Sequence, residues 1–288
     1  MENKSLTVFT PTYNRESLLP RLYESLTRQT SDDFVWLIVD DGSTDNTKAL
    51  IDSYKLENKV RILYFYRENG GKMRAHNDGV KNCATPYFLC VDSDDYLVET
   101  AVEKLLAVAN EKNILSDASC AGIISHKGKS ETELLSDVNF PENINKSTLY
   151  GLYLNGFKGE TTIMFVTDVI KRFLFPEIDG EKYVPEDYIY DKIDSEYEYI
   201  VLDEIITVCE IVSEGYTDSV IKLKKNNPVA FNLYYEQRAI ITPPSVLKIK
   251  YLGFYVKYSK ICGKNIFDTK LPKPYVIIGL IASVFINE

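Results

Sequence analysis

Two groups of acidic residues have the types and spacing that could bind a metal ion. Asp92 and Asp94 are separated by a single serine, and Asp95 follows them directly. Asp40 and Asp41 stand side by side earlier in the chain. Carboxylates crowded at one place repel one another unless a cation or hydrogen bonds offset their charge. Hard oxygen ligands suit Mg²⁺ or Mn²⁺, which commonly bridge carboxylates and the phosphates of a substrate.

The elements that must position these acids alternate between strand and helix. The expected strands are Leu6–Thr10, Phe34–Asp40, Arg61–Tyr66 and Pro86–Val91. The expected helices are Ser17–Arg28, Asp45–Tyr54, Met73–Lys81 and Val98–Lys112. This alternation predicts an α/β fold with a Rossmann-like, mostly parallel central sheet flanked by helices. Ligands of such sheets bind beyond the carboxyl ends of the strands, and both acidic groups stand there.

Each acidic group also has a simpler interpretation. The stretch Asp41–Asp45 is a good turn followed by a helix N-cap, and Asp94 and Asp95 could favour the dipole of the next helix. Other phosphate-binding designs are missing from the sequence, since no GxGxxG turn follows the first strand and no GxxxxGK[ST] motif occurs. Carboxylates following two strands at one edge of the sheet therefore favour a metal site.

Charge is segregated along the chain. The 288 residues include 33 Lys and Arg against 42 Asp and Glu, a net charge of −9, which argues against nucleic acid as the main partner. Residues 177–204 hold 11 acids and 2 lysines, whereas residues 222–288 hold 11 basic residues and 3 acids. No signal-peptide core is visible, and the longest apolar run is shorter than the ~20 residues that span a bilayer. With five cysteines and no CxxC pair, we expect a cytoplasmic protein.

Four segments together resemble family 2 glycosyltransferases, which have the GT-A fold. They are Val8–Arg15, Leu37–Asp45, Asn69–Gly79 and Tyr87–Asp95, in the order and spacing of the family. The resemblance implies inverting transfer of a sugar from a nucleotide diphosphate donor, with UDP favoured, to a hydroxyl group. The implied acceptor is a saccharide or a lipid-linked saccharide in bacterial cell-surface polysaccharide synthesis.

The resemblance also assigns roles to single residues. The residues that would border the nucleotide base are Thr10, Pro11, Tyr13 and Arg15, with Tyr13 offering a stacking face. Either Asp40 or Asp41 would accept a hydrogen bond from the base. The residues placed to meet the pyrophosphate are Arg67 and Lys72. The DxD motif, Asp92 and Asp94, would hold Mn²⁺ or Mg²⁺, which stabilises charge on the departing nucleoside diphosphate.

The resemblance also implies that the catalytic base is one of two adjacent acids at the start of a later helix. Direct displacement at the anomeric carbon needs one carboxylate to take the proton of the acceptor hydroxyl. In the matching segment Pro185–Asp191, Asp187 fits the usual position and Glu186 is the second candidate. A helix with acids in its first turn is the structural alternative.

Histidines are scarce where related enzymes often have one. The stretch Cys209–Asp218, after the last strands, contains no histidine that could complete a metal shell. Water, or a carboxylate such as Glu214 or Asp218, would fill that role if it exists. His76 belongs to a matching segment, but a histidine on a helix is more often a core or surface residue than a ligand.

The rest of the chain predicts a larger catalytic region and a tail. Residues 1–220 are expected to form the catalytic domain, with a nucleotide-sugar half at 1–112 and an acceptor half at 113–220. Residues 221–288 are expected to form a basic, amphipathic helical region. On a helical wheel the basic residues on one side are Lys250, Lys257, Lys260 and Lys264. The apolar residues that fill much of the rest are Leu247, Tyr251, Leu252, Phe254, Tyr255 and Tyr258.

Such a helix suggests adhesion to an anionic membrane surface, here the inner face of the cell membrane. A helix packed on the catalytic domain with solvated lysines is the alternative. A partner transferase or a second copy of the chain could also cover the apolar end, Tyr275–Ile286.

Two other functions are compatible with parts of this pattern. A nucleotidyltransferase that makes the activated sugar would favour a glycine-rich basic loop after the first strand, which Thr10–Arg15 lacks. A catalytically inactive homologue that binds nucleotide sugar or assists a partner would not need its acidic pairs. Both pairs are present in this sequence.

Overall fold

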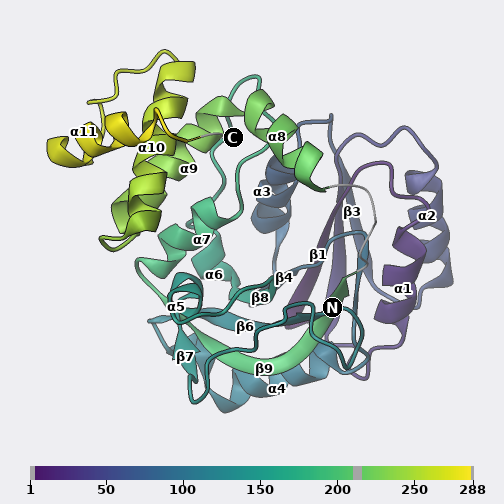
Figure 1. Ribbon diagram of the computed structural model, residues 1–288. Coiled ribbons are helices and arrows are strands. Elements are labelled where there is room, and N and C mark those ends of the chain that lie inside the picture. The colour runs from purple at the N-terminus through teal and green to yellow at the C-terminus, as the bar shows by residue number, and fades with distance from the viewer. Residues whose placement is uncertain (1–3, 210–215, 287–288) are drawn as a thin grey trace. The chain divides into compact units, whose positions relative to one another are not determined.

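The computed structural model describes residues 4–209 and 216–286, without the side chains of residues 216–219. The chain forms two compact units (Figure 1). The first comprises Met1–Leu174 and Ile189–Val212, and the second comprises Phe175–Tyr188 and Ser213–Glu288. Every described strand belongs to the first unit. The domain boundaries predicted at residues 112 and 220 stay predictions.

The first half of the sheet is parallel, as the strand–helix alternation predicts. Its strands are β1 (Leu6–Thr12), β2 (Phe34–Asp40), β3 (Ile62–Tyr66) and β4 (Tyr87–Cys90), in the order β3-β2-β1-β4. The helices between and after them are α1 (Leu19–Thr27), α2 (Thr47–Glu57), α3 (Lys72–Asn82) and α4 (Ala101–Glu111). These four strands and four helices confirm the predicted elements.

The second half of the sheet is mixed. Its strands are β5 (Asp95–Leu97), β6 (Cys120–Gly128), β7 (Lys146–Ser147), β8 (Thr161–Val166) and β9 (Glu198–Cys209). β8 runs antiparallel to β4 and β6, and β9 runs parallel to β6 but antiparallel to β5 and β7. The regular alternation that forces parallel crossovers ends after α4. The short helical segments of this part are η1 (Ile114–Ser116), α5 (Leu149–Leu154) and α6 (Thr167–Ile170).

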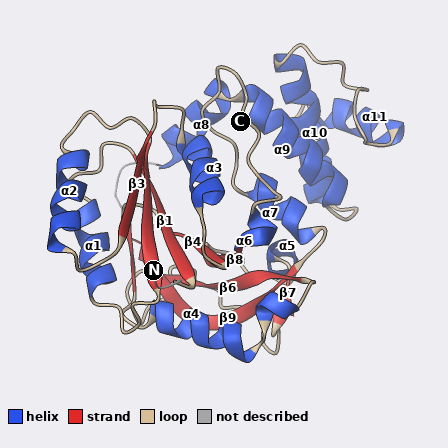
Figure 2. Cartoon of the chain, turned by 180° about the vertical axis from the view of Figure 1, so that it is seen from behind, coloured by secondary structure: helices blue, strands red, loops and turns tan. Residues whose placement is uncertain are grey.

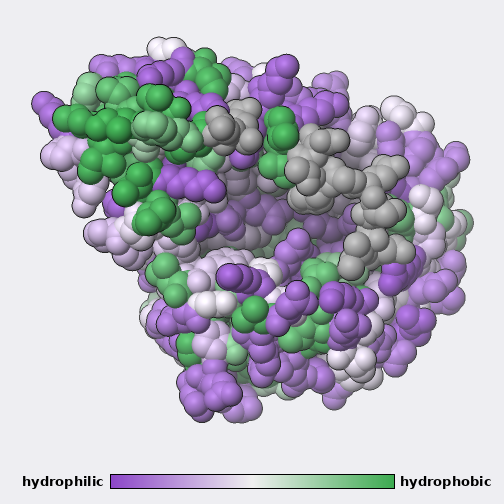
Figure 3. Space-filling view, in the orientation of Figure 1, coloured by the Kyte–Doolittle hydropathy of each residue, from purple (hydrophilic) through white to green (hydrophobic). Residues whose placement is uncertain are grey.

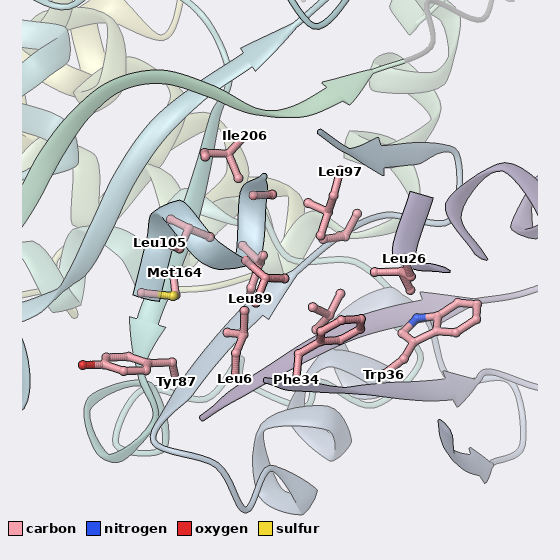
Figure 4. Packing of buried hydrophobic residues seen from close by; sticks show 14 of the residues in the cluster. Leu6, Leu26, Phe34, Trp36, Tyr87, Leu89, Leu97, Leu105, Met164 and Ile206 are labelled. Carbon is pink, nitrogen blue, oxygen red and sulfur yellow. The ribbon is translucent and has the colours of Figure 1, made fainter. Parts of the chain in front are cut away.

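Both faces of the parallel strands are buried. Leu6 and Val8 of β1 point into a core shared with α1, α2 and α4, part of which is shown in Figure 4. Phe9 points the other way and packs on Phe88 and on His76 of α3. Figure 2 shows α1 and α2 on one side of these strands and α3 on the other. This two-sided cover explains why all seven residues of β2 are buried.

The second unit is helical. Its helices are α8 (Tyr216–Asn226), α9 (Pro228–Ile241), α10 (Val246–Ile261) and α11 (Lys273–Ala282). The side chain of Glu181 accepts hydrogen bonds from the backbone amides of Val229 and Ala230, at 2.7 and 2.8 Å, and so satisfies the amino end of α9.

The aromatic side of α10 is buried within the second unit, and the membrane contact predicted for residues 246–288 stays a prediction. Phe254, Tyr255 and Tyr258 are at most 6% exposed and form a core with α9. Lys264 lies beyond the end of α10, and its ammonium donates to the amide oxygen of Asn232 at 3.0 Å. The helical wheel identified an apolar side correctly but could not identify what covers it.

Candidate functional site

The turns after β1 and β2 are joined at the carboxyl edge of the sheet. The backbone amide of Asn14 donates to the hydroxyl of Ser43 at 2.9 Å, and the amide of Thr44 donates to Asn14 Oδ1 at 2.8 Å. Asn14 has a φ of 51°, a conformation that asparagine tolerates better than most residues. Sequence reasoning missed this role, although an asparagine between Tyr13 and Arg15 in a turn was a usable signal.

The four residues predicted to border a nucleotide base are not equally placed. Thr10 is fully buried, and its hydroxyl accepts the indole N–H of Trp36 at 3.0 Å. Pro11 is also buried, whereas Tyr13 and Arg15 are exposed. Only Tyr13 and Arg15 therefore offer side chains to a ligand at this edge.

Asp40 is buried and already accepts two hydrogen bonds. Its Oδ1 accepts the backbone amide of Ser43 at 2.8 Å, and its Oδ2 accepts the hydroxyl of Tyr64 at 2.7 Å. Burial and the contact with Asp40 raise the pKa of Tyr64. The hydroxyl of Tyr64, which no sequence signal identified, orients this carboxylate.

Asp41 ties the loop after β3 to the end of β2. Its two oxygens accept the backbone amides of Gly70 and Gly71 at 2.9 and 2.7 Å, and the side chain of Asn69 donates at 3.2 Å. Nε of Arg67 lies 3.2 Å from the same carboxylate. Gly42 permits this contact, because a Cβ atom there would lie 2.8 Å from the backbone nitrogen of Asn69. Arg67, predicted to meet pyrophosphate, thus pairs with Asp41.

Two of the three acids after β4 pair with lysines. Nζ of Lys72 lies 2.8 Å from Oδ1 of Asp92, and Nζ of Lys127 lies 3.0 Å from Oδ2 of Asp95. Burial favours the neutral form of Asp92, but the charges of Lys72 and Lys127 outweigh it and hold its pKa below the ordinary value. Burial raises the pKa of Asp95. Lys127, on β6, was missed because its sequence neighbours belong to no recognised motif.

These residues fit a divalent cation whose shell a ligand completes. Asp92 and Asp94 are half-buried carboxylates two positions apart, and Asp92 already holds a cationic group. No hydrogen bond or ion pair engages the carboxylate of Asp94 within the described part of the chain. Over those same residues, no three His, Cys, Asp or Glu side chains converge as a metal site. A cation here would need further oxygens from water or from a diphosphate, as Mg²⁺ commonly does.

The predicted base candidates stand at the start of α7 (Asp187–Asp194), within the second unit. Oδ2 of Asp187 lies 2.7 Å from a guanidinium nitrogen of Arg238 on α9. Burial raises the pKa of Asp187 above its ordinary value; Arg238 opposes this shift and the charge of Glu186 adds to it. A carboxylate with a raised pKa is a better proton acceptor than an ordinary one. Arg238 had no signal in the sequence, since it lies 51 positions from Asp187.

The histidine expectations have different outcomes. His76 is buried against Phe9 and Phe88, as expected for a core residue. Glu214 and the side chain of Asp218, the suggested substitutes for a missing histidine, lie outside the described residues. Their roles stay predictions.

The strands and acids of this edge lie within a stretch that matches a known family. The family model described as glycosyl transferase family 2 matches residues 7–172, more than half of the chain. The chain belongs to glycosyl transferase family 2. The resemblance stated from four segments is therefore confirmed. The matched residues include the DxD motif, Asp92 and Asp94, but not the acidic pair at Glu186 and Asp187.

Curated relatives of this family 2 chain are longer proteins. An uncharacterized glycosyltransferase of Rickettsia felis is 33% identical over 129 residues, which cover 45% of this chain and 21% of that protein. Glycosyltransferase GlyG of Streptococcus pneumoniae is 36% identical over 110 residues, which cover 38% of this chain and 36% of that protein. The match thus spans from about a fifth to about a third of the length of these relatives.

Solved structures show the same fold. TarS of S. aureus, residues 1–349 in complex with UDP-GlcNAc, aligns with a TM-score of 0.62 at 19% identity, over 96% of this chain and 79% of that chain. The mannosyltransferase PcManGT of Pyrobaculum calidifontis, in complex with GDP-Man and Mn²⁺, aligns with a TM-score of 0.52 at 18% identity, over 99% of this chain and 70% of that chain. The predicted GT-A fold is confirmed.

Proposed function

We propose that this chain is an inverting, metal-dependent glycosyltransferase that uses a UDP-sugar donor and a saccharide or lipid-linked acceptor. The observation that carries the proposal is the half-buried pair Asp92 and Asp94 beyond β4, in a chain of family 2. The TarS neighbour is a complex with UDP-GlcNAc, and the P. calidifontis neighbour is a complex with GDP-Man and Mn²⁺. These complexes support a nucleotide-sugar donor and a divalent ion.

Residues of the first unit would bind the donor. Tyr13 would stack on the base, and Asp40 or Asp41 would accept a hydrogen bond through a remaining lone pair. Asp92 and Asp94 would hold Mn²⁺ or Mg²⁺, which when bound supplies positive charge that stabilises the leaving diphosphate. Lys72 would reach the same phosphates.

Asp187 would take the proton of the acceptor hydroxyl, and Glu186 is the second candidate. Arg238 would keep Asp187 ionised, since it opposes the rise in pKa that burial causes. A carboxylate that is ionised near neutral pH, and whose pKa lies above that of an ordinary carboxyl group, suits this proton transfer.

A screen of nucleotide sugars with Mn²⁺ and Asp94→Ala and Asp187→Ala variants tests the proposal. Asp94→Ala should abolish turnover and weaken donor binding, whereas Asp187→Ala should lose turnover and keep donor affinity. Asp52→Ala is the matched control, because Asp52 is an exposed acid on α2 that pairs only with Lys48 among the described residues. Proton NMR of the anomeric centre in the product checks inversion.

The results separate this function from the two alternatives. Full transfer by Asp187→Ala would move the base to Glu186 or reject the mechanism. Formation of a UDP-sugar from a sugar phosphate and UTP would identify a nucleotidyltransferase. Donor binding without turnover of any sugar would indicate an inactive homologue.

We also propose that the second unit docks on an anionic membrane, through α11 and the start of α10. Exposed apolar side chains gather there (Figure 3), and the most exposed are Val246, Ile281, Val284 and Phe285. Val246, Ile281 and Phe285 border a groove of about 420 Å³ that Lys250 also lines. Lys273 begins α11. Apolar side chains with lysines nearby suit a surface of anionic lipid. No helix in the described residues has the length and hydropathy of a membrane span.

Sedimentation with phosphatidylglycerol and phosphatidylcholine vesicles tests the docking surface. Wild type should sediment with the anionic vesicles, and Ile281→Glu should reduce this several-fold. Leu56→Glu is the matched control, since Leu56 is an exposed apolar residue of α2 in the first unit. Unchanged sedimentation of Ile281→Glu, or a dimer that the variant disrupts, would reject a membrane in favour of another contact.

A further inference from the structure

The half-exposed side chain of Lys72 contacts Asp92, the first aspartate of the DxD motif. Nζ of Lys72, at the start of α3, lies 2.8 Å from Oδ1 and 2.9 Å from Oδ2 of Asp92. The two side chains are 37% and 32% exposed, so packing does not lock either of them in place. An ammonium group in contact with both oxygens takes the position that a divalent cation would need at this carboxylate.

The second lysine of the site is held differently. Nζ of Lys127 lies 3.0 Å from Asp95 and 3.5 Å from Glu160, and its side chain is only 17% exposed. Removing a buried charge from its partners is costly, so Lys127 should stay in place when a ligand binds. Of the two lysines, Lys72 is the one that can leave its carboxylate.

A divalent cation that binds both oxygens of Asp92 would have to displace Lys72 from them. Like charges a few ångströms apart repel strongly at a partly buried site. A bound diphosphate would bring new negative charge next to the metal, and a lysine at the start of α3 is long enough to follow it. The exchange therefore becomes favourable when metal and diphosphate arrive together.

We propose that Lys72 is an exchangeable counter-ion of the DxD motif. It holds Asp92 in the free protein and transfers to the donor diphosphate when a divalent cation takes its place. The inference rests on the proposed function of this site. Its consequence is that metal and nucleotide strengthen each other's binding by the same factor, while metal alone binds weakly.

Direct titration of Mn²⁺, followed by electron paramagnetic resonance of the free ion, tests the exchange without any turnover. In the absence of nucleotide, Lys72→Met should bind Mn²⁺ about tenfold more tightly than wild type, because no ammonium competes for Asp92. Lys72→Arg keeps the charge and should behave like wild type. Lys81→Met, at the other end of α3, is the matched control and should not change the affinity. Adding Asp92→Asn to Lys72→Met should remove the gain.

A second titration with UDP separates the inference from a simple phosphate contact. UDP should tighten Mn²⁺ binding less in Lys72→Met than in wild type. If Lys72 only contacts phosphate, Lys72→Met will leave Mn²⁺ affinity unchanged in the absence of UDP, and the inference is overturned. It is equally overturned if no variant binds Mn²⁺ with or without UDP. Mn²⁺-dependent transfer by wild type alongside the first result would show that the proposed function survives.

Discussion

Asp41 follows β2 and Asp92 follows β4, the two strands that flank β1 in the parallel sheet, but their surroundings differ. Asp41 is 4% exposed and receives two backbone amides, an asparagine side chain and the guanidinium of Arg67. Asp92 is half-buried, and its carboxylate contacts the ammonium of Lys72. One carboxylate is enclosed by donors of the loop that it fixes, and the other is held by one side chain that can move.

This difference indicates what each acid contributes. Replacing Asp41 would leave the half-buried amides of Gly70 and Gly71 without this acceptor, so its main effect should be on folding. Replacing Asp92 would leave only a half-exposed ammonium, which water can solvate, so its main effect should be on ligand chemistry. Acidic pairs that look alike in sequence thus separate into a carboxylate with structural contacts and one that we propose binds a ligand.

The largest expected effect is the loss of turnover in Asp92→Asn. We expect transfer from the donor to fall about a thousandfold, or about 4 kcal/mol of transition-state stabilisation, because the proposed metal site loses an ionised ligand. The free energy of unfolding in urea should change by less than about 1 kcal/mol, since the pair with Lys72 is half-exposed. Turnover within tenfold of wild type would contradict a functional Asp92.

Asp41→Ala should have the next largest effect, on stability. Loss of one acceptor strands the amides of Gly70 and Gly71 and the guanidinium of Arg67, so we expect the free energy of unfolding to fall by about 3 kcal/mol. Urea denaturation followed by circular dichroism measures it. Asp52→Ala, an exposed acid of α2, should change it by less than about 0.5 kcal/mol. An equal fall in the free energy of unfolding in the two variants would show that Asp41 is no more structural than an acid on the surface of α2.

The sequence was sufficient to predict the strands and the edge where the acids gather. Hydrophobic runs and turn residues are local signals, and Phe34–Asp40 was predicted at the bounds that the structure has. The partners of Asp41 could not be predicted, because they are backbone amides brought near by the β2–β3 pairing. Arg67 was assigned to pyrophosphate because the sequence shows its charge but does not show its contact with Asp41.

In the second unit, too, contacts between distant residues could not be predicted from the sequence. The helical period of α10 shows that one side is apolar, but whether protein or membrane covers that side depends on α9. Arg238 pairs with Asp187 through the packing of α9 beside the segment before α7, a contact between residues distant in sequence. Long-range pairs of this kind leave no mark in one sequence.

Asp187 resembles Asp92 more than Asp41, because each of the two carboxylates pairs with one cationic side chain. Its pKa is raised by burial, and Arg238 opposes that rise, so Arg238→Met should raise the pKa further. The proposed base acts when ionised, so the acid limb of the pH–rate profile should move to higher pH. Turnover at neutral pH should change by less than about tenfold. Arg172→Met, which removes an exposed pair with Glu196, should leave the limb in place.

Replacing Asp117 tests whether burial or hydrogen bonding makes Asp41 important for stability. Of these predictions it has the smallest expected effect. Like Asp41 it accepts a backbone amide, from Ser119 at 2.9 Å, and it pairs with a cation, Lys146 at 3.0 Å, but its side chain is 39% exposed. The hydroxyl of Ser119, Lys146 and the amide of Ser119 lower its pKa from 3.8 to about 2.

A lowered carboxyl pKa adds stability above the unfolded value, and this stability is lost as pH falls through the folded value. Asp117→Asn should therefore flatten the loss of stability between pH 4 and pH 2. It should lower the free energy of unfolding at pH 7 by less than about 1 kcal/mol, because solvent screens the site. Urea denaturation across that pH range measures both quantities. A loss as large as that of Asp41→Ala would show that the number of donors, and not burial, makes a carboxylate structural in this fold.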